Sequence, residues 1–301
     1  MRHIALEQTP FTPLDEHAAT AFTALVQAAL REDRADEDIT TACLVAPEVQ
    51  AKASIGFRSP GIVAGLQVAQ LAFQLVDPAI RFTHAVVDGT RVNHGSVVAE
   101  VSGCASAMLR AERVALNFLA RLSGTATLTH AYVAAVDGLP VRIADTRKTT
   151  PGLRALERYA VRAGGGFNHR DTLADAVLIK DNHLSACGGV ANAVAQARSC
   201  VSGGTVIEVE CERLEQVQEA MRAGADAILL DNMSLDQLRA AVQVARGYAA
   251  LEASGGVMLG NVREIAQTGV DVISVGALTH GARSLDVGLD FVADPAVVKA
   301  R

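Results

Sequence analysis

Six short apolar runs between residues 141 and 276 constrain the fold of this chain more than any other feature. They alternate with helical stretches, and this alternation is typical of βα units that build a parallel sheet. Each run ends in a charged residue, a serine or a glycine: VRIAD at Asp145, AVLIKD at Asp181, TVIEVE at Glu210, AILLD at Asp231, ALEAS at Ser254 and DVISVG at Gly276. Because the strand ends of a βα-barrel converge on one opening, these endings predict a functional site there.

The length of this region predicts the kind of sheet. A complete eight-stranded barrel takes about 250 residues, which is more than the region offers. We therefore expect an incomplete α/β barrel over 124–284, preceded by an N-terminal α+β sandwich domain over 1–123. A tail, 285–301, is expected to pack back on the first domain.

The first domain has its own pattern. Residues 52–57, 81–87 and 97–101 alternate between apolar and polar side chains, which is typical of half-buried antiparallel strands. Helical spacing predicts a helix over 14–30, capped by Asp15, and two more helices over 106–122 and 125–136, separated by a break at Ser123-Gly124.

Composition excludes several classes of protein. Half of the 301 residues are hydrophobic but only 4% are aromatic, as expected for parallel sheets flanked by helices. The net charge of -6 argues against a nucleic-acid or acidic-membrane binder, because such proteins need a basic face. Residues 142–180, however, contain eight Lys/Arg and four Asp/Glu, so this segment carries +4 and the rest of the chain -10. Cations are thus concentrated in one segment.

The cysteines and the N-terminal sequence predict the cellular compartment of the protein. The five cysteines are odd in number and form no CxxC, so we expect reduced, buried thiols in a reducing cytosol; they are Cys43, Cys104, Cys187, Cys200 and Cys211. The N-terminus lacks the apolar run of a signal peptide. The apolar stretch 61–76 carries three glutamines at helical spacing, which favours an amphipathic helix over a membrane span. We predict a cytoplasmic protein.

The loop after the first run, DTRKTTPGLR, places Arg147 beside Lys148. An arginine can bind a carboxylate or phosphate with two hydrogen bonds while a lysine supplies a mobile charge, so the loop is a candidate anion site. A solvated basic loop is the alternative. Lys180 follows an apolar run, where a lysine is unusual unless it is paired or functional. Three glycines at 164–166 precede His169 and Arg170, and they allow a ligand close to the backbone or form a flexible connector.

Carboxylates and glycines end the later runs. Glu208 and Glu210 share one face of a strand, and Asp231 ends the next one. Two carboxylates at neighbouring strand ends can hold Mg²⁺ or bind sugar hydroxyls; helix capping by Asp231 and a surface role for Glu208 are the alternatives. Two glycine-containing endings are candidate phosphate sites, Ser254-Gly255-Gly256 and Val275-Gly276-Ala277.

A line of polar residues also runs along the helix predicted over 106–122. Arg113, Asn117 and Arg121 recur at every fourth position. They form either a solvated face or a cationic stripe for an active site. Together with the strand-end residues, this pattern asks for a small polyanionic substrate with a phosphate, a sugar and Mg²⁺.

Long blocks of the sequence resemble one enzyme family, nicotinate-nucleotide pyrophosphorylase (carboxylating), also called quinolinate phosphoribosyltransferase. The blocks are ERVALNFLARLSGTATLT at 112–129, IADTRKTTPGLRALERYAVRAGGGFNHR at 143–170, LIKDNH at 178–183, IEVE at 207–210, LLDNM at 229–233, LEASGG at 251–256 and ISVGALTH at 273–280. The resemblance implies a type II phosphoribosyltransferase that joins quinolinate to 5-phosphoribosyl-1-pyrophosphate with Mg²⁺. It also implies a homodimer, or a higher oligomer, whose active sites are shared between subunits.

The resemblance further implies roles for individual residues. Lys148, Lys180, Glu210 and Asp231 are the implied catalytic residues, and Glu210 and Asp231 hold Mg²⁺ directly or through water. Arg113 reaches the substrate from the partner subunit. The implied substrate-binding set is Arg113, Thr146, Arg147, Lys148, His169, Arg170, Lys180, Glu210, Asp231, Ser254, Gly255, Gly256, Val275, Gly276 and Ala277.

Three positions depart from the family pattern. They are Glu37, Ala163 and Gly281, and they put loop conformation in doubt more than activity. Three other functions stay open: a nicotinate phosphoribosyltransferase, a Schiff-base aldolase that uses Lys180, and a phosphosugar sensor without catalysis.

Overall fold

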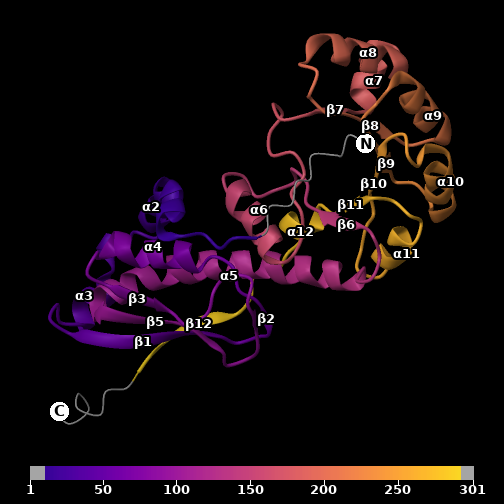
Figure 1. The fold of residues 1–301 in the computed structure, drawn as a ribbon. Helices are drawn as coiled ribbons and strands as arrows, with labels where there is room; N and C mark the ends of the chain where they lie inside the picture. Colours follow the sequence, from indigo (N-terminus) through magenta and orange to yellow (C-terminus); the bar gives the residue numbers. More distant parts are fainter. Residues whose placement is uncertain (1–10, 293–301) are drawn as a thin grey trace. The chain divides into compact units, whose positions relative to one another are not determined.

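The computed structural model describes residues 11–292, and the chain forms two compact units (Figure 1). The parallel-sheet unit contains Thr129–Arg154 and Gly165–Gly281. The antiparallel-sheet unit contains Phe11–Leu128, Ala155–Gly164 and the chain from Ala282. The domain boundaries drawn from the sequence stay a prediction. Residues 293–301 of the predicted tail lie outside the described residues.

The antiparallel-sheet unit is built on a four-stranded sheet in the order β12-β1-β5-β3. Its strands are β1 (Gln50–Phe57), β3 (Arg81–His84), β5 (Val97–Cys104) and β12 (Val287–Phe291). The predicted strands 52–57, 81–87 and 97–101 correspond to β1, β3 and β5. Ala53, Ile55 and Phe57 of β1 are buried, as alternation requires. β12 pairs antiparallel with β1, so the chain returns to this sheet near its end.

Helices complete this unit, and Figure 1 shows α4 and the first half of α5 on one face of the sheet. Asp15 caps the first helix by accepting the backbone N–H of Ala18, as predicted. The remaining elements are α1 (Glu16–Ala19), η1 (Thr20–Phe22), α2 (Thr23–Glu32), η2 (Ala35–Glu37), α3 (Ile39–Leu44), β2 (Gly61–Ile62), α4 (Leu66–Val76), β4 (Arg91–Val92), α5 (Ala105–Ala135) and α6 (Arg154–Ala163).

The predicted break at Ser123-Gly124 is wrong, because α5 is one continuous helix of 31 residues. Ser123 is fully buried, and its hydroxyl accepts the backbone N–H of Ala64. At Gly124, a Cβ atom would clash with the carbonyl oxygen of Arg283. The glycine therefore permits the close approach of a distant chain segment and does not end the helix.

The parallel-sheet unit contains six strands in the order β6-β11-β10-β9-β8-β7, and every neighbouring pair is parallel. The strands are β6 (Arg142–Ala144), β7 (Val177–Ile179), β8 (Ile207–Cys211), β9 (Ala227–Asp231), β10 (Ala250–Ser254) and β11 (Val272–Ser274). They coincide with the six apolar runs. Phe167 adds a single parallel bridge to Ala144 of β6. The predicted α/β class, with a parallel-sheet unit and a separate α+β unit, is confirmed.

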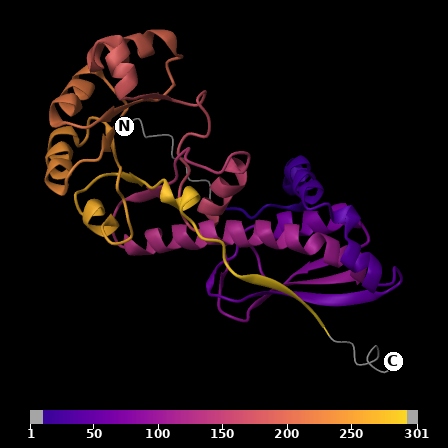
Figure 2. The same ribbon diagram turned by 180° about the vertical axis from the view of Figure 1, so that it is seen from behind.

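Short helices follow the strands of the parallel sheet. They are α7 (Asp181–Cys187), α8 (Val190–Cys200), α9 (Leu214–Ala223), α10 (Leu235–Ala245), α11 (Val262–Ala266) and α12 (Ala277–His280). Figures 1 and 2 show α7 to α10 along the outer, convex side of the sheet. This is the layering expected when each crossover between parallel strands carries a helix.

Two further expectations concern cysteines and membranes. Cys211 is buried, but Cys43 and Cys200 are exposed, so the prediction that all five thiols are buried is wrong. Cys43 lies on the six-residue helix α3, and Cys200 is the last residue of α8, where little chain is available to cover them. Within residues 11–292, no helix combines the length and the apolar character needed to cross a membrane.

Candidate functional site

The carboxyl ends of the six parallel strands lie along one edge of their sheet. The register pairs Ser254 with Asp231, Ile179 with Val209, and Ser274 with Ala144. Most predicted site residues lie in the last two positions of one of these strands or in the segment directly after it. The exceptions are Arg113 on α5, and His169 and Arg170 between α6 and β7. The edge therefore collects residues that are far apart in the sequence, as parallel βα units do.

Lys180 and Glu210 form an ion pair at this edge. The Nζ atom of Lys180 lies 2.6 Å from Oε2 of Glu210, between the ends of the neighbouring strands β7 and β8. The lysine side chain is 46% exposed and the glutamate side chain 13%. Because an ammonium has three donors, Lys180 can bind an anion while it contacts Glu210.

The loop after β6 carries the predicted anion site. The backbone N–H of Lys148 donates to Thr146 Oγ1 at 3.1 Å, and its carbonyl accepts the hydroxyl of Thr279 at 2.7 Å. A Cβ atom at position 276 would lie 3.0 Å from Cδ of Lys148. The absence of a side chain at Gly276 thus leaves room for the Lys148 side chain beside the loop after β11.

Arg147 and Arg170 bring two guanidinium groups into one neighbourhood. Burial lowers the pKa of Arg170, and the positive charge of Arg147 lowers it further. Arg170 also donates from Nη1 to the carbonyl of Ala176 at 2.9 Å. Two like charges held near each other favour an anionic ligand that neutralises them.

The segments after β9 and β10 pack against each other. Asn232 adopts a left-handed backbone (φ 54°), donates from Nδ2 to Asp231 Oδ2 at 2.6 Å, and donates its N–H to the Ser254 carbonyl at 2.9 Å. Gly255 has φ 87°, and a Cβ there would clash with the Asn232 side chain. The next residue, Gly256, also has positive φ, and its carbonyl accepts Asn261 Nδ2 at 3.0 Å. Glycine is required at position 255 for both conformation and space.

A buried group of three ionisable side chains lies on one face of the sheet, and we call it the internal cluster: His169, Glu208 and Glu252. Nε2 of His169 is 3.2 Å from Oε2 of Glu208 and 3.2 Å from Oε2 of Glu252. The three side chains are 10%, 4% and 1% exposed. The alternative that Glu208 has a surface role is therefore wrong, because its partner is an internal histidine.

The internal cluster binds an additional proton. Burial lowers the pKa of His169, but hydrogen bonds and attraction from Glu208 and Glu252 outweigh this effect and raise the pKa to about 10. Nδ1 already accepts the backbone N–H of Arg170 at 2.8 Å, so a second ring proton would displace that bond. Burial and the charge of Glu252 also raise the pKa of Glu208. The additional proton belongs to the cluster as a whole, and Nε2 carries the ring hydrogen that faces the two carboxyl groups.

Metal binding favours a different place. The ligand atoms of the internal cluster lie within 4.8 Å of one another, but a metal ion there would have to displace the hydrogen of Nε2. Glu210 and Asp231 end the neighbouring strands β8 and β9, and each engages a protein donor through one oxygen, Oε2 and Oδ2 respectively. A carboxylate has a second oxygen, and oxygen ligands or their bridging waters suit Mg²⁺. These two residues fit the ion.

Two arginines of the polar residues along α5, Arg113 and Arg121, differ in their surroundings. Arg121 is paired with the fully buried Glu157, at 2.7 Å, and donates to the carbonyl of Ala282 at 2.6 Å. Both alternatives drawn from the sequence are therefore wrong for Arg121, which holds α5, α6 and the chain after α12 together. Arg113 is 63% exposed, and it lies in the antiparallel-sheet unit.

Sequence reasoning gave no individual role to three residues. Asp145 is fully buried and accepts the His169 N–H and the Asn168 side chain, each at 2.7 Å. Glu252 completes the internal cluster, and Asn232 supports the loop after β10. The signal for Glu252 was present, since a charged residue inside the apolar run ALEAS is as unusual as Lys180 after AVLI.

Comparisons with known proteins agree with this geometry. Residues 125–290 match the C-terminal domain of quinolinate phosphoribosyl transferase and residues 38–123 its N-terminal domain. The chain is 44% identical to the probable nicotinate-nucleotide pyrophosphorylase [carboxylating] of Bacillus subtilis over 259 residues, which cover 86% of this chain and 89% of the relative. It is 44% identical to the Mycobacterium leprae nicotinate-nucleotide pyrophosphorylase [carboxylating] over 272 residues, 88% and 95% of the two chains.

A solved structure shows the same fold. The nicotinate-nucleotide pyrophosphorylase from Francisella tularensis superposes with a TM-score of 0.88 at 38% identity, covering 95% of this chain and all of that one. Both family domains, the close relatives and the shared fold lead to one conclusion: this chain belongs to the quinolinate phosphoribosyl transferase family.

Proposed function

We propose that this chain transfers a phosphoribosyl group from 5-phosphoribosyl-1-pyrophosphate to quinolinate, in the biosynthesis of NAD. The products are nicotinate mononucleotide, pyrophosphate and CO₂. The carboxylating pyrophosphorylases of Bacillus subtilis and Mycobacterium leprae support this reaction. The observation that carries the proposal is the group of cations at the carboxyl edge of the parallel sheet, Arg147, Lys148, Arg170 and Lys180. The cytoplasmic location stays a prediction.

The cations bind the two anionic substrates. Quinolinate has two carboxylates, and the sugar donor has a phosphate and a pyrophosphate. Arg147 and Arg170 suit the planar carboxylates, because a guanidinium offers two parallel donors. Lys148 and Lys180 supply point charges that follow the pyrophosphate as it leaves. The hydroxyl oxygen of Thr146 accepts the backbone N–H of Lys148 and so orients that residue.

The reaction is a displacement at the ribose followed by decarboxylation. The pyridine nitrogen bonds to C1 of the ribose while pyrophosphate departs with the electron pair of the C1–O bond. Positive charge develops on the ribose ring, and the carboxylates of Glu210 and Asp231 stabilise it. The 2-carboxylate then leaves as CO₂, and its electron pair stays on C2 beside the positive ring nitrogen until a solvent proton adds there. Lys148, Lys180, Glu210 and Asp231 are thus the proposed catalytic residues.

Mg²⁺ is the proposed cofactor. When bound, it supplies positive charge that neutralises the leaving pyrophosphate. Glu210 and Asp231 hold it, directly or through water, with the carboxylate oxygens that do not contact Lys180 and Asn232. Removing divalent cations with a chelator is expected to abolish turnover, and adding back Mg²⁺ to restore it.

The glycine-containing loops bind the 5-phosphate. The segments Ser254-Gly255-Gly256 and Val275-Gly276-Ala277 follow the neighbouring strands β10 and β11. Backbone N–H groups of such loops bind phosphate oxygens, and glycines let the phosphate approach closely. The packing of Gly255 on Asn232 supports one fixed loop conformation.

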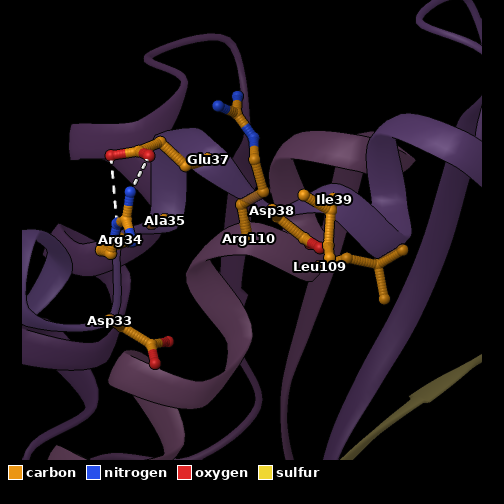
Figure 3. A pocket seen from close by; sticks show the side chains of 8 residues that line it. All are labelled: Asp33, Arg34, Ala35, Glu37, Asp38, Ile39, Leu109 and Arg110. Carbon is orange, nitrogen blue, oxygen red and sulfur yellow. Dashed lines mark hydrogen bonds and ion pairs between the residues drawn. The ribbon is translucent and has the colours of Figure 1, made fainter.

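We also propose that the active protein is a homodimer, or a higher oligomer, with shared active sites. Arg113 is an exposed cation that lies outside the parallel-sheet unit. Nearby in sequence on α5, Leu109 and Arg110 line a pocket of about 460 Å³ in the antiparallel-sheet unit, together with residues between Asp33 and Ile39 (Figure 3). Ile39 and Leu44 are each 79% exposed on α3. Exposed apolar side chains on α3 and an exposed arginine on α5 suit contact with a second copy.

Subunit mixing tests the shared site. Arg113→Ala and Lys180→Ala proteins are each expected to be inactive. Mixed dimers contain one site with both intact residues, so mixing is expected to restore a fraction of the activity. No recovery, with subunit exchange verified by native mass spectrometry, contradicts a site shared between subunits.

Acceptor preference tests the function against its rivals. We expect nicotinate mononucleotide from quinolinate and none from nicotinate, measured by chromatography with the sugar donor and Mg²⁺. The opposite preference would identify a nicotinate phosphoribosyltransferase. The Schiff-base alternative is disfavoured because Nζ of Lys180 is engaged with Glu210 at 2.6 Å, whereas a Schiff-base lysine attacks with a free amine. Binding without turnover would favour a sensor.

A further inference from the structure

The internal cluster contacts the backbone of Arg170, one of the proposed substrate-binding residues. The segment that carries Arg170 leaves the sheet at Phe167, which exchanges backbone hydrogen bonds with Ile143 and Asp145 at 2.8 and 3.0 Å. Asp145 then accepts the N–H of His169 and the side chain of Asn168. The backbone is thus fixed up to His169 by a fully buried carboxylate.

The His169 ring connects the sheet to the next residue. Glu208 on β8 and Glu252 on β10 pair in register with Ala227 and Leu229 of β9, so the two glutamates share one face of the sheet. Both reach Nε2 of the ring at 3.2 Å. On the opposite side of the ring, Nδ1 accepts the backbone N–H of Arg170 at 2.8 Å. A single rigid ring therefore links two buried carboxyl groups to the backbone of Arg170.

We propose that Glu208 and Glu252 are positioning residues, which act through His169 to fix the backbone of Arg170 and hence the direction of its guanidinium group. This inference rests on the proposed function, because it concerns the side chain that receives a quinolinate carboxylate. The two carboxyl groups, each with an oxygen 3.2 Å from Nε2, attract the ring hydrogen to Nε2, which leaves the Nδ1 lone pair for the Arg170 N–H. The far end of Arg170 is held separately by the Ala176 carbonyl.

The kinetic test uses Glu252→Gln, with Asp226→Asn as the matched control. Asp226 also has a buried carboxylate, directly before β9, but it accepts the N–H of Ile207, at the amino end of β8. We expect Glu252→Gln to raise KM for quinolinate by about tenfold, because the attraction of one carboxylate for the His169 ring is lost, with kcat and KM for the sugar donor changed by less than about threefold. Asp226→Asn should leave all three parameters within about twofold. A KM for quinolinate unchanged in Glu252→Gln overturns the proposal.

A double variant separates positioning from general weakening. If Glu252 acts through Arg170, Glu252→Gln in an Arg170→Ala background should change KM for quinolinate by less than about twofold. Independent, multiplying effects overturn the proposal. An inactive wild-type protein would instead refute the proposed function, so the two failures are distinguishable.

The ring itself can be observed in the unmodified protein, even if a variant fails to fold. Nitrogen NMR of histidine-labelled wild-type protein, with the His169 signals assigned through His169→Asn, should report a neutral ring with its hydrogen on Nε2 at neutral pH. A ring protonated at Nδ1 contradicts the proposal, because it cannot accept the Arg170 N–H.

Discussion

Two ion pairs occupy opposite ends of β8, and they differ in what surrounds them. At the carboxyl end, Lys180 binds Glu210 at 2.6 Å; at the amino end, Arg198 binds Asp226 at 2.8 Å. Arg198 also donates to the carbonyls of Gly224 and Thr205, and Asp226 accepts the first N–H of β8. Both side chains of the amino-end pair are thus also hydrogen-bonded to the backbone.

The carboxyl-end pair keeps bonding capacity for a ligand. Lys180 is more exposed than Arg198, 46% against 32%, and Glu210 more exposed than Asp226, 13% against 8%. Among the described residues, Glu210 is the one bonded partner shown for the Lys180 ammonium. Similar pairs therefore serve different purposes: one joins strand, helix and loop, whereas the other presents charge to the substrate.

The largest expected effect is on activity, when the cation of each ion pair is removed. Lys180→Ala removes a cation that faces the leaving pyrophosphate, so kcat/KM should fall by about 10² to 10³. Arg198→Ala should change kcat/KM by less than about threefold while it lowers the melting temperature, because its bonds are structural. Steady-state kinetics and thermal unfolding of both variants provide the check. Equal losses of activity would remove the distinction between the ends.

Two glycines, one at each edge of the parallel sheet, extend the comparison to the free energy of unfolding. Gly255, after β10, and Gly224, before β9, both have positive φ. Only at position 255 would a Cβ clash with a neighbour, Asn232, whereas position 224 is open. We expect Gly224→Ala to cost about 1 kcal/mol from backbone strain and Gly255→Ala about 3 kcal/mol, with a raised KM for the sugar donor.

Denaturant unfolding measures these costs. Equal free energies of unfolding for the two alanine variants would mean that the Asn232 contact is not tight. An unchanged KM for the sugar donor in Gly255→Ala would argue against phosphate binding by this loop.

The last prediction concerns the pH dependence of stability. The folded cluster keeps its additional proton up to about pH 10, whereas an unfolded histidine loses it near 6.5. The folded state thus binds more protons in this window, so its stabilisation is complete below pH 6.5 and is lost as the pH rises toward 10. The free energy of unfolding should fall by at most about 1.4 kcal/mol per pH unit. Glu252→Gln removes one charge from the cluster and should flatten this slope; equal slopes would contradict the assignment.

Local patterns in the sequence were sufficient for the strands and their ends. The apolar runs predict β6 to β11, and parallel pairing brings Lys180, Glu210, Asp231 and Ser254 to one edge without further information. The roles of these residues came from resemblance, since spacing alone left an anion loop and a solvated loop equally open.

Side-chain partners across distant elements could not be predicted in the same way. Glu252 joins Glu208 at the His169 ring because β8 and β10 lie on either side of β9. This neighbourhood is a consequence of sheet order. Gly124 looked like a helix break because its reason, the approach of Arg283, lies about 160 residues away in sequence. Arg121 was misassigned for the same cause: its buried partner Glu157 is on another helix.

One measurement tests the central claim, that the carboxyl edge of the parallel sheet performs a decarboxylating phosphoribosyl transfer. Quinolinate labelled in its 2-carboxyl group is incubated with purified folded protein, 5-phosphoribosyl-1-pyrophosphate and Mg²⁺, and released CO₂ is counted against nicotinate mononucleotide formed. We predict one labelled CO₂ for each nucleotide, and none when the sugar donor is omitted. No labelled CO₂ from the complete mixture, or nucleotide formed without it, would contradict the account.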